Sequence, residues 1–67
     1  MTFNEIISNC SLYIGKCFLI KSETSMTLGH FILIKCEKNI LIFKAEDNLE
    51  FKVSPSMSYY FELCEIH

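Results

Sequence analysis

The chain has 67 residues, 51% of them hydrophobic, and its six lysines and eight acidic residues, with no arginine, give a formal net charge of −2. A domain this small buries only about 60% of the surface that its unfolded chain exposes, so a disulfide, a metal or a partner subunit usually stabilises it. Arginine is the preferred side chain for bidentate phosphate recognition, and its absence disfavours a general nucleic-acid binder.

Membrane insertion and secretion are not indicated by the sequence. The longest uninterrupted apolar runs, such as Phe31 to Ile34, are far shorter than the roughly 20 residues that span a bilayer. The chain does not open with a basic region followed by an apolar stretch, the mark of a secretion signal. We therefore expect no membrane partner and a cytoplasmic location.

Residues 2–10 are predicted to form a short helix. Thr2 and Glu5 have the spacing of a capping box, in which each side chain accepts a hydrogen bond from an amide of the first turn. Four apolar residues recur at the spacing of one helical face: Phe3, Ile6, Ile7 and Cys10. A helix this short is marginal by itself, so we expect it to dock on the rest of the domain.

Five β-strands are predicted after the helix, and together they make the chain a single small β-barrel domain. Gly15 predicts a bend or bulge in the first strand, and the turn at Pro55 precedes the last strand. Five antiparallel strands with short connections favour closure into a strongly bent antiparallel small barrel, since closure removes open edges. The predicted strands cover about residues 12–21, 28–36, 40–45, 49–54 and 58–65.

Two similar turns set the expected register of the three middle strands. The triplets Glu37–Asn39 and Glu46–Asn48 each end in Asn, a residue that readily adopts the left-handed conformation needed at the end of a three-residue hairpin loop. Taking each triplet as the loop predicts these opposed pairs: Cys36–Ile40, Ile34–Ile42, Ala45–Leu49, Phe43–Phe51 and Leu41–Val53, with Leu33 near Phe43.

This register divides the apolar residues between two faces of the sheet. The predicted core face carries Phe31, Leu33, Leu41, Phe43, Ala45, Leu49, Phe51 and Val53. The other face carries isoleucines, which either the N-terminal helix or the far barrel wall covers, or which form a partner surface. Tyrosine is enriched at interfaces, so the candidate interface residues are Ile32, Ile34, Ile40, Ile42, Tyr59, Tyr60 and Phe61.

The four cysteines are widely spaced and include no CxxC pair. In a cytosolic chain this spacing argues against a disulfide framework, so all four are expected to be reduced. His30, His67, Cys36 and Cys64 lack the close pairing typical of a zinc site. No nucleophile–base arrangement or glycine-rich phosphate loop is apparent, and we expect neither a metal, nor a cofactor, nor an enzyme activity.

The element order resembles the Sm-like family, in which an N-terminal helix caps a five-stranded curved barrel. Gly29 stands ten residues before Asn39, and Asn39-Ile40-Leu41-Ile42 resembles the asparagine and following aliphatic strand of the first Sm motif. The position of the family's aspartate holds Lys35, and residues 54–57 contain no counterpart of its second motif. The resemblance implies subunits that join by pairing strand four with strand five of the next copy.

The sequence favours a non-enzymatic binding module: an Sm-like barrel that self-assembles or binds a protein partner, as a regulator or inhibitor. The alternative is an RNA- or nucleotide-binding Sm-like ring, with Lys35, Lys38 and Asn39 as the candidate nucleic-acid-binding residues and aromatic side chains for base stacking.

Overall fold

The protein is mainly β: five antiparallel strands form one sheet, and two short helices precede them. The computed structural model describes residues 1–64. The last strand is shorter than the predicted range 58–65. The predicted end of that strand, Glu65, and the metal-ligand candidate His67 lie outside the described residues. The elements are α1 (Phe3–Ser8), α2 (Cys10–Tyr13), β1 (Cys17–Lys21), β2 (Thr27–Glu37), β3 (Ile40–Lys44), β4 (Glu50–Val53) and β5 (Tyr60–Leu63).

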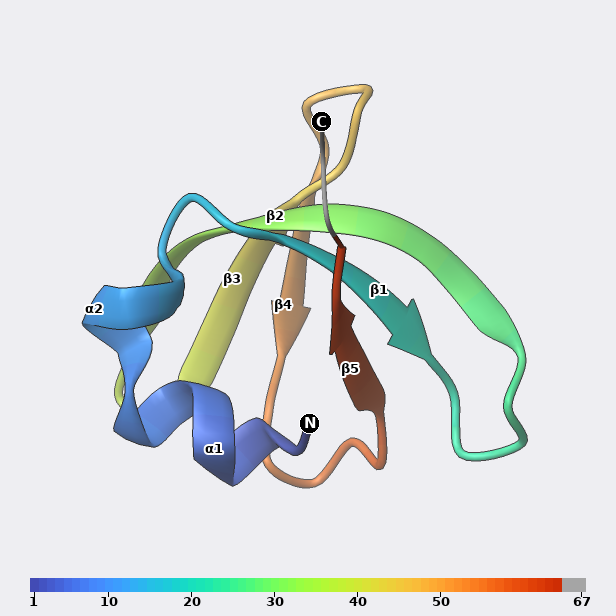
Figure 1. The fold of residues 1–67 in the computed structure, drawn as a ribbon, viewed down its shortest axis with the longest axis horizontal. Helices are drawn as coiled ribbons and strands as arrows, with labels where there is room; N and C mark the ends of the chain where they lie inside the picture. Colours follow the sequence, from blue (N-terminus) through green and yellow to red (C-terminus); the bar gives the residue numbers. More distant parts are fainter. Residues whose placement is uncertain (65–67) are drawn as a thin grey trace.

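Helix α1 confirms the predicted capping box and the predicted docking. The Thr2 hydroxyl accepts a hydrogen bond from the Glu5 amide, and the Glu5 carboxylate accepts one from the Thr2 amide. Phe3 and Ile6 are buried, and Ile7 packs against the same core. The helix lies across the open end of the curved sheet (Figure 1), so its apolar face adds to the core although it has only 6 residues.

The first strand begins later than predicted. Residues 10–13 form α2, and β1 starts at Cys17 instead of Leu12. Gly15 lies between these two elements with a φ of +87°, a conformation that glycine adopts without a Cβ clash. Its amide donates to Leu33 O at 2.7 Å, and Leu33 donates to Lys16 O at 3.1 Å. Gly15 is therefore the turn that brings the chain onto β2, and it is not a bulge inside a strand.

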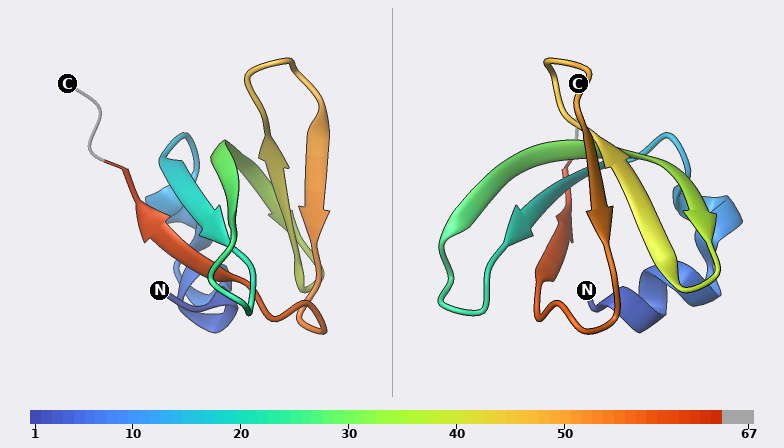
Figure 2. Two further views of the ribbon diagram at one scale, coloured as in Figure 1. Left: turned by 90° about the vertical axis from the view of Figure 1, so that its right-hand side faces the viewer. Right: turned by 180° about the vertical axis from the view of Figure 1, so that it is seen from behind.

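The sheet has the order β4-β3-β2-β1-β5 and is strongly curved but open. The predicted barrel closure is not observed, because β4 and β5 do not pair with each other. After β4 the chain crosses beneath the sheet through Pro55 and adds β5 beside β1. Figure 2 shows β4 and β5 on opposite sides of the molecule, with the curved strands between them.

The β3–β4 register is as predicted, whereas the β2–β3 turn is not. Phe43 faces Phe51 and Leu41 faces Val53. In the first hairpin Glu37 pairs with Ile40, so the loop is the two residues Lys38 and Asn39, both with positive φ. Two consecutive left-handed residues make a tighter loop than the predicted triplet. The predicted pairs Cys36–Ile40 and Ile34–Ile42 are therefore wrong.

A bulge at Ile34 restores the expected register nearer the middle of the sheet. The pairing shifts between Leu33 and Lys35, so Leu33 still faces Phe43 as predicted. A bulge places an extra residue on one strand and increases the local bend. It therefore reconciles the short turn with an apolar concave face.

The core lies between the concave face of the sheet and α1. Phe43 is its centre: its ring stacks on Phe61 at 5.7 Å and meets Phe18 edge-on at 5.9 Å. The α1 residues join this concave face, so the alternative in which the N-terminal helix covers the isoleucine face is not observed. Leu49, predicted in the core, is 67% exposed because it ends the β3–β4 loop. The buried core consists of Phe3, Ile6, Phe18, Ile20, Leu33, Leu41, Phe43, Val53 and Phe61.

A disulfide joins Cys10 of α2 to Cys36 of β2, so the prediction of four reduced cysteines is wrong. Cys17 and Cys64 are free. Residue 36 faces Leu41 across the bulged hairpin and packs against the core, which turns its sulfur toward α2. A disulfide is the kind of covalent constraint that a 67-residue domain needs. Stable disulfides are rare in the cytosol, so this disulfide disfavours the predicted cytoplasmic location.

Candidate functional site: the edges of the sheet

The outer edge of β4 is available for strand addition. The Ala45 amide donates to Leu49 O at 3.0 Å at the start of the β3–β4 hairpin, so these two residues are a hydrogen-bonded pair. Hydrogen-bonded pairs recur at every second residue of an antiparallel ladder, so Phe43–Phe51 and Leu41–Val53 are hydrogen-bonded pairs as well. The intervening residues of β4 therefore direct their N–H and C=O groups away from β3. Within residues 1–64, no backbone hydrogen bond joins this outer edge to another segment.

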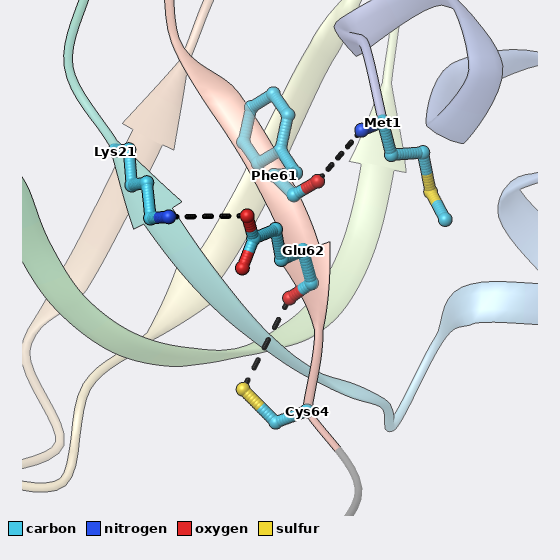
Figure 3. Close-up of polar contacts among 5 residues, drawn as sticks. All are labelled: Met1, Lys21, Phe61, Glu62 and Cys64. Atoms are coloured by element: carbon cyan, nitrogen blue, oxygen red, sulfur yellow. Dashed lines mark hydrogen bonds and ion pairs between the residues drawn. The ribbon is translucent and has the colours of Figure 1, made fainter. Parts of the chain in front are cut away.

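The outer edge of β5 is partly covered by the N-terminal residue. The Met1 amino group donates to Phe61 O at 2.8 Å (Figure 3), and the Phe61 amide donates to Met1 O at 3.0 Å. This is the exchange of two hydrogen bonds that a neighbouring strand would make. A short covering segment is one of the ways in which proteins protect a sheet edge.

Polar side chains on the convex face also hold β5 against β1. Lys21 Nζ and Glu62 Oε1 form an ion pair at 3.1 Å (Figure 3). Both side chains are partly exposed, and an exposed pair of this kind contributes about 1 kcal/mol or less. The ladder from Phe18–Leu63 to Lys21–Tyr60 and the buried Phe61 side chain are therefore the main attachments of β5, and the ion pair adds little.

Apolar side chains are exposed beside both edges. Leu49 immediately precedes β4, while Tyr60 and Leu63 belong to β5; they are 67%, 54% and 43% exposed. Single exposed apolar residues are ordinary, and other large apolar residues, such as Leu12 and Met26, are exposed away from the edges. The two edges thus combine free backbone groups with apolar side chains.

The structure divides the predicted interface residues between the surface and the interior. Ile32 and Tyr60 are exposed, and Ile34, Ile40 and Tyr59 are half-buried. Ile42 and Phe61 are buried in this chain, so their side chains do not line a free surface. On β5 the side chains alternate, and Phe61 points to the core while Tyr60 points outward.

The candidate nucleic-acid-binding residues lie together near the β2–β3 turn, but the positive charge of Lys35 is paired with the carboxylate of Glu37. Lys35 Nζ lies 2.6 Å from a Glu37 carboxylate oxygen. The hydrogen bond to Glu37, together with its charge, raises the pKa of Lys35, and Lys35 lowers the pKa of Glu37 in the same way. Lys38 and Asn39 are exposed, and Asn39 has the φ of +65° that the turn requires. Nucleic-acid binding here stays a prediction.

Metal-ligating residues are not clustered in the described part of the chain. Within residues 1–64, no group of three or more His, Cys, Asp or Glu side chains is placed to hold a metal ion. No helix in the same range has the length and apolar content to cross a membrane.

Comparison with models of known families, with curated proteins and with solved structures finds no match to this chain.

Sequence reasoning missed the two contacts that shape these edges. No local pattern places Met1 beside Phe61, because the two are 60 residues apart. The disulfide between Cys10 and Cys36 had a signal, namely an even number of cysteines in a domain too small to rely on its core alone. The expected cytosolic location outweighed this signal.

Proposed function

We propose that this protein is a non-enzymatic binding module that assembles with further copies of itself through the edge strands β4 and β5, in the manner of the Sm-like family. The observation that carries the proposal is the open outer edge of β4, with the unpaired N–H and C=O groups of Glu50 and Lys52. An added strand satisfies such groups and contributes main-chain hydrogen bonds.

The two ends of the sheet differ, and this difference favours a head-to-tail arrangement. One end is β4 and the other is β5, so a contact between them joins two different surfaces. Heterologous contacts of this kind form a ring when the rotation between copies closes, and a filament when it does not.

Hydrophobic burial supplies the driving force for this assembly. Leu49, Tyr60 and Leu63 are exposed at the ends that would meet, and burial of apolar surface stabilises by about 25 cal/mol per Å². Met1 must leave Phe61 when a second copy pairs along the whole of β5, and the incoming strand replaces its two hydrogen bonds. The number of hydrogen bonds is thus nearly unchanged by the exchange, while more apolar surface is buried.

Replacement of Lys52 tests the proposal at a single backbone group. Lys52→Pro removes an N–H that points away from β3, so the β3–β4 ladder survives while an incoming strand loses a donor and meets the proline ring. Lys52→Thr is the matched control, since it also removes the ammonium group but keeps the N–H. Sedimentation velocity at increasing concentration should show an oligomer for the natural chain and Lys52→Thr, and a monomer for Lys52→Pro. A natural chain that stays monomeric at high concentration would refute assembly.

A further inference from the structure

The two free cysteines lie opposite each other at one end of edge strand β5. Cys17 is the first residue of β1, and Cys64 directly follows β5. The β1–β5 ladder pairs Phe18 with Leu63, so its next position opposes Cys17 to Cys64. The Cys64 amide donates to Cys17 O at 3.0 Å, which shows that the ladder continues to this pair.

This arrangement suits a covalent bond between the two sulfurs. Opposed residues of an antiparallel ladder place their side chains on the same face, with Cα atoms roughly 4.5–5.5 Å apart. Disulfides join Cα atoms that are roughly 4.4–6.8 Å apart. The backbone positions of Cys17 and Cys64 therefore already satisfy the requirement, and only side-chain rotation is needed.

The present side-chain contacts do not oppose that rotation. Cys64 Sγ donates to Glu62 O at 4.0 Å, a long contact within its own strand (Figure 3). Burial raises the pKa of the Cys17 thiol, and the neighbouring Cys64 thiol and Glu46 carboxylate raise it further. A raised pKa makes the Cys17 thiolate less available than that of an ordinary cysteine, so in the proposed exchange Cys64 attacks first.

We propose that Cys17 and Cys64 form a reversible thiol–disulfide site that ties the edge strand β5 to β1. With glutathione disulfide as oxidant, the deprotonated Cys64 sulfur attacks one glutathione sulfur and releases a first glutathione thiolate. The deprotonated Cys17 sulfur then attacks the Cys64 sulfur of this mixed disulfide and releases the second. The protein loses two protons and two electrons, and glutathione disulfide is reduced to two glutathione thiols.

The bond would add a covalent attachment to an edge strand. Strand β5 has only 4 residues and a single sheet neighbour, β1, with Met1 on its other side. Oxidation fixes its far end, so the sheet opens less readily at β5. This site is independent of the proposed assembly, because the bond forms within one chain.

Peptide mapping tests the site directly. The native protein is equilibrated with oxidised and reduced glutathione, quenched with acid, alkylated and digested with trypsin, which cleaves after lysine. Cleavage at Lys16, Lys21 and Lys52 places Cys17 in peptide 17–21 and Cys64 in peptide 53–67. We expect these two peptides to be linked in a chain of monomer mass, and the link to disappear on reduction. Peptides 1–16 and 36–38, linked through the disulfide already present, serve as the internal control.

Single substitutions separate this site from unspecific oxidation. Cys17→Ser and Cys64→Ser should each leave one cysteine that is free or carries glutathione, with no linked peptide. The oxidised natural chain should unfold at a temperature on the order of 10 °C higher than either variant in the same buffer. Separate glutathione adducts on both cysteines of the natural chain, a link found only between two chains, or equal unfolding temperatures would overturn the proposal.

Discussion

Breaking the Cys10–Cys36 disulfide should remove much of the stability of this domain. The two residues are separated by 26 positions, and the loss of loop-closure entropy in the unfolded chain for such a loop corresponds to about 3.5 kcal/mol. A domain of 67 residues has a total stability of roughly 3–10 kcal/mol. The disulfide thus accounts for a third or more of the free energy of unfolding.

Thermal unfolding followed by circular dichroism measures this contribution. For a domain of this size, about 3.5 kcal/mol corresponds to a fall in Tm of roughly 15–25 °C. We expect that fall on adding a phosphine reductant to the natural chain and in the Cys10→Ser/Cys36→Ser double variant without reductant. The Cys17→Ser/Cys64→Ser double variant keeps the Cys10–Cys36 disulfide and is the matched control. Without reductant, its Tm should stay near that of the natural chain in which Cys17 and Cys64 are free thiols.

Two results would refute this reasoning. A natural chain that titrates with four free thiols in denaturant would show that the bond does not form. An unchanged Tm in the Cys10→Ser/Cys36→Ser variant would show that α2 is held to β2 without it. The fall in Tm must therefore accompany the loss of the linked peptides 1–16 and 36–38.

The remaining predictions concern the docked helix and the free thiols. Ile6→Asp should lower the free energy of unfolding by several kcal/mol in denaturant, since Ile6 is fully buried and an unpaired carboxylate would replace it. The control, Asn4→Asp on the exposed side of α1, should change that free energy by roughly 0.5 kcal/mol or less. Equal effects of the two substitutions would contradict docking of the helix. Iodoacetamide labelling of Cys17 should require higher pH in the folded protein than in denaturant, because burial, and then the Cys64 thiol and the Glu46 carboxylate, raise its folded pKa. The stability that its protonated form contributes is present below the unfolded pKa and is lost as pH rises through the folded pKa. Identical labelling profiles in the two states would contradict this.

Local patterns predicted the parts of the fold that local physics determines. The capping box at Thr2 and Glu5 forms as expected because both partners lie in one helical turn. The Phe43–Phe51 register follows from a loop whose last residue, Asn48, has the expected positive φ of 67°. In the other hairpin two consecutive residues adopt positive φ, and an alternation of apolar residues cannot distinguish that loop from a longer one with a compensating bulge.

Other errors depend on contacts between residues far apart in sequence. The predicted barrel closure is not observed, because β5 pairs with β1 and no pairing joins β5 to β4. The same distance hid the role of Met1 at Phe61 and the bond between Cys10 and Cys36. Such contacts are selected by the whole chain in three dimensions, and the spacing of residue types along the sequence carries little information about them.

The unequal protection of the two edges bears on how the protein could control its own assembly. If both β4 and β5 were open, every copy would offer two complementary surfaces, and association could continue without limit unless it closed into a ring. Met1 occupies the outward groups of Phe61, whereas the outward groups of Lys52 have no counterpart among the described residues. In the proposed assembly, the outer edge of β4 can therefore pair with an incoming strand directly. Pairing along the whole of β5 first requires Met1 to leave Phe61. Because every proposed contact joins one β4 to one β5, release of Met1 from Phe61 would be a step of each contact that uses the whole of β5.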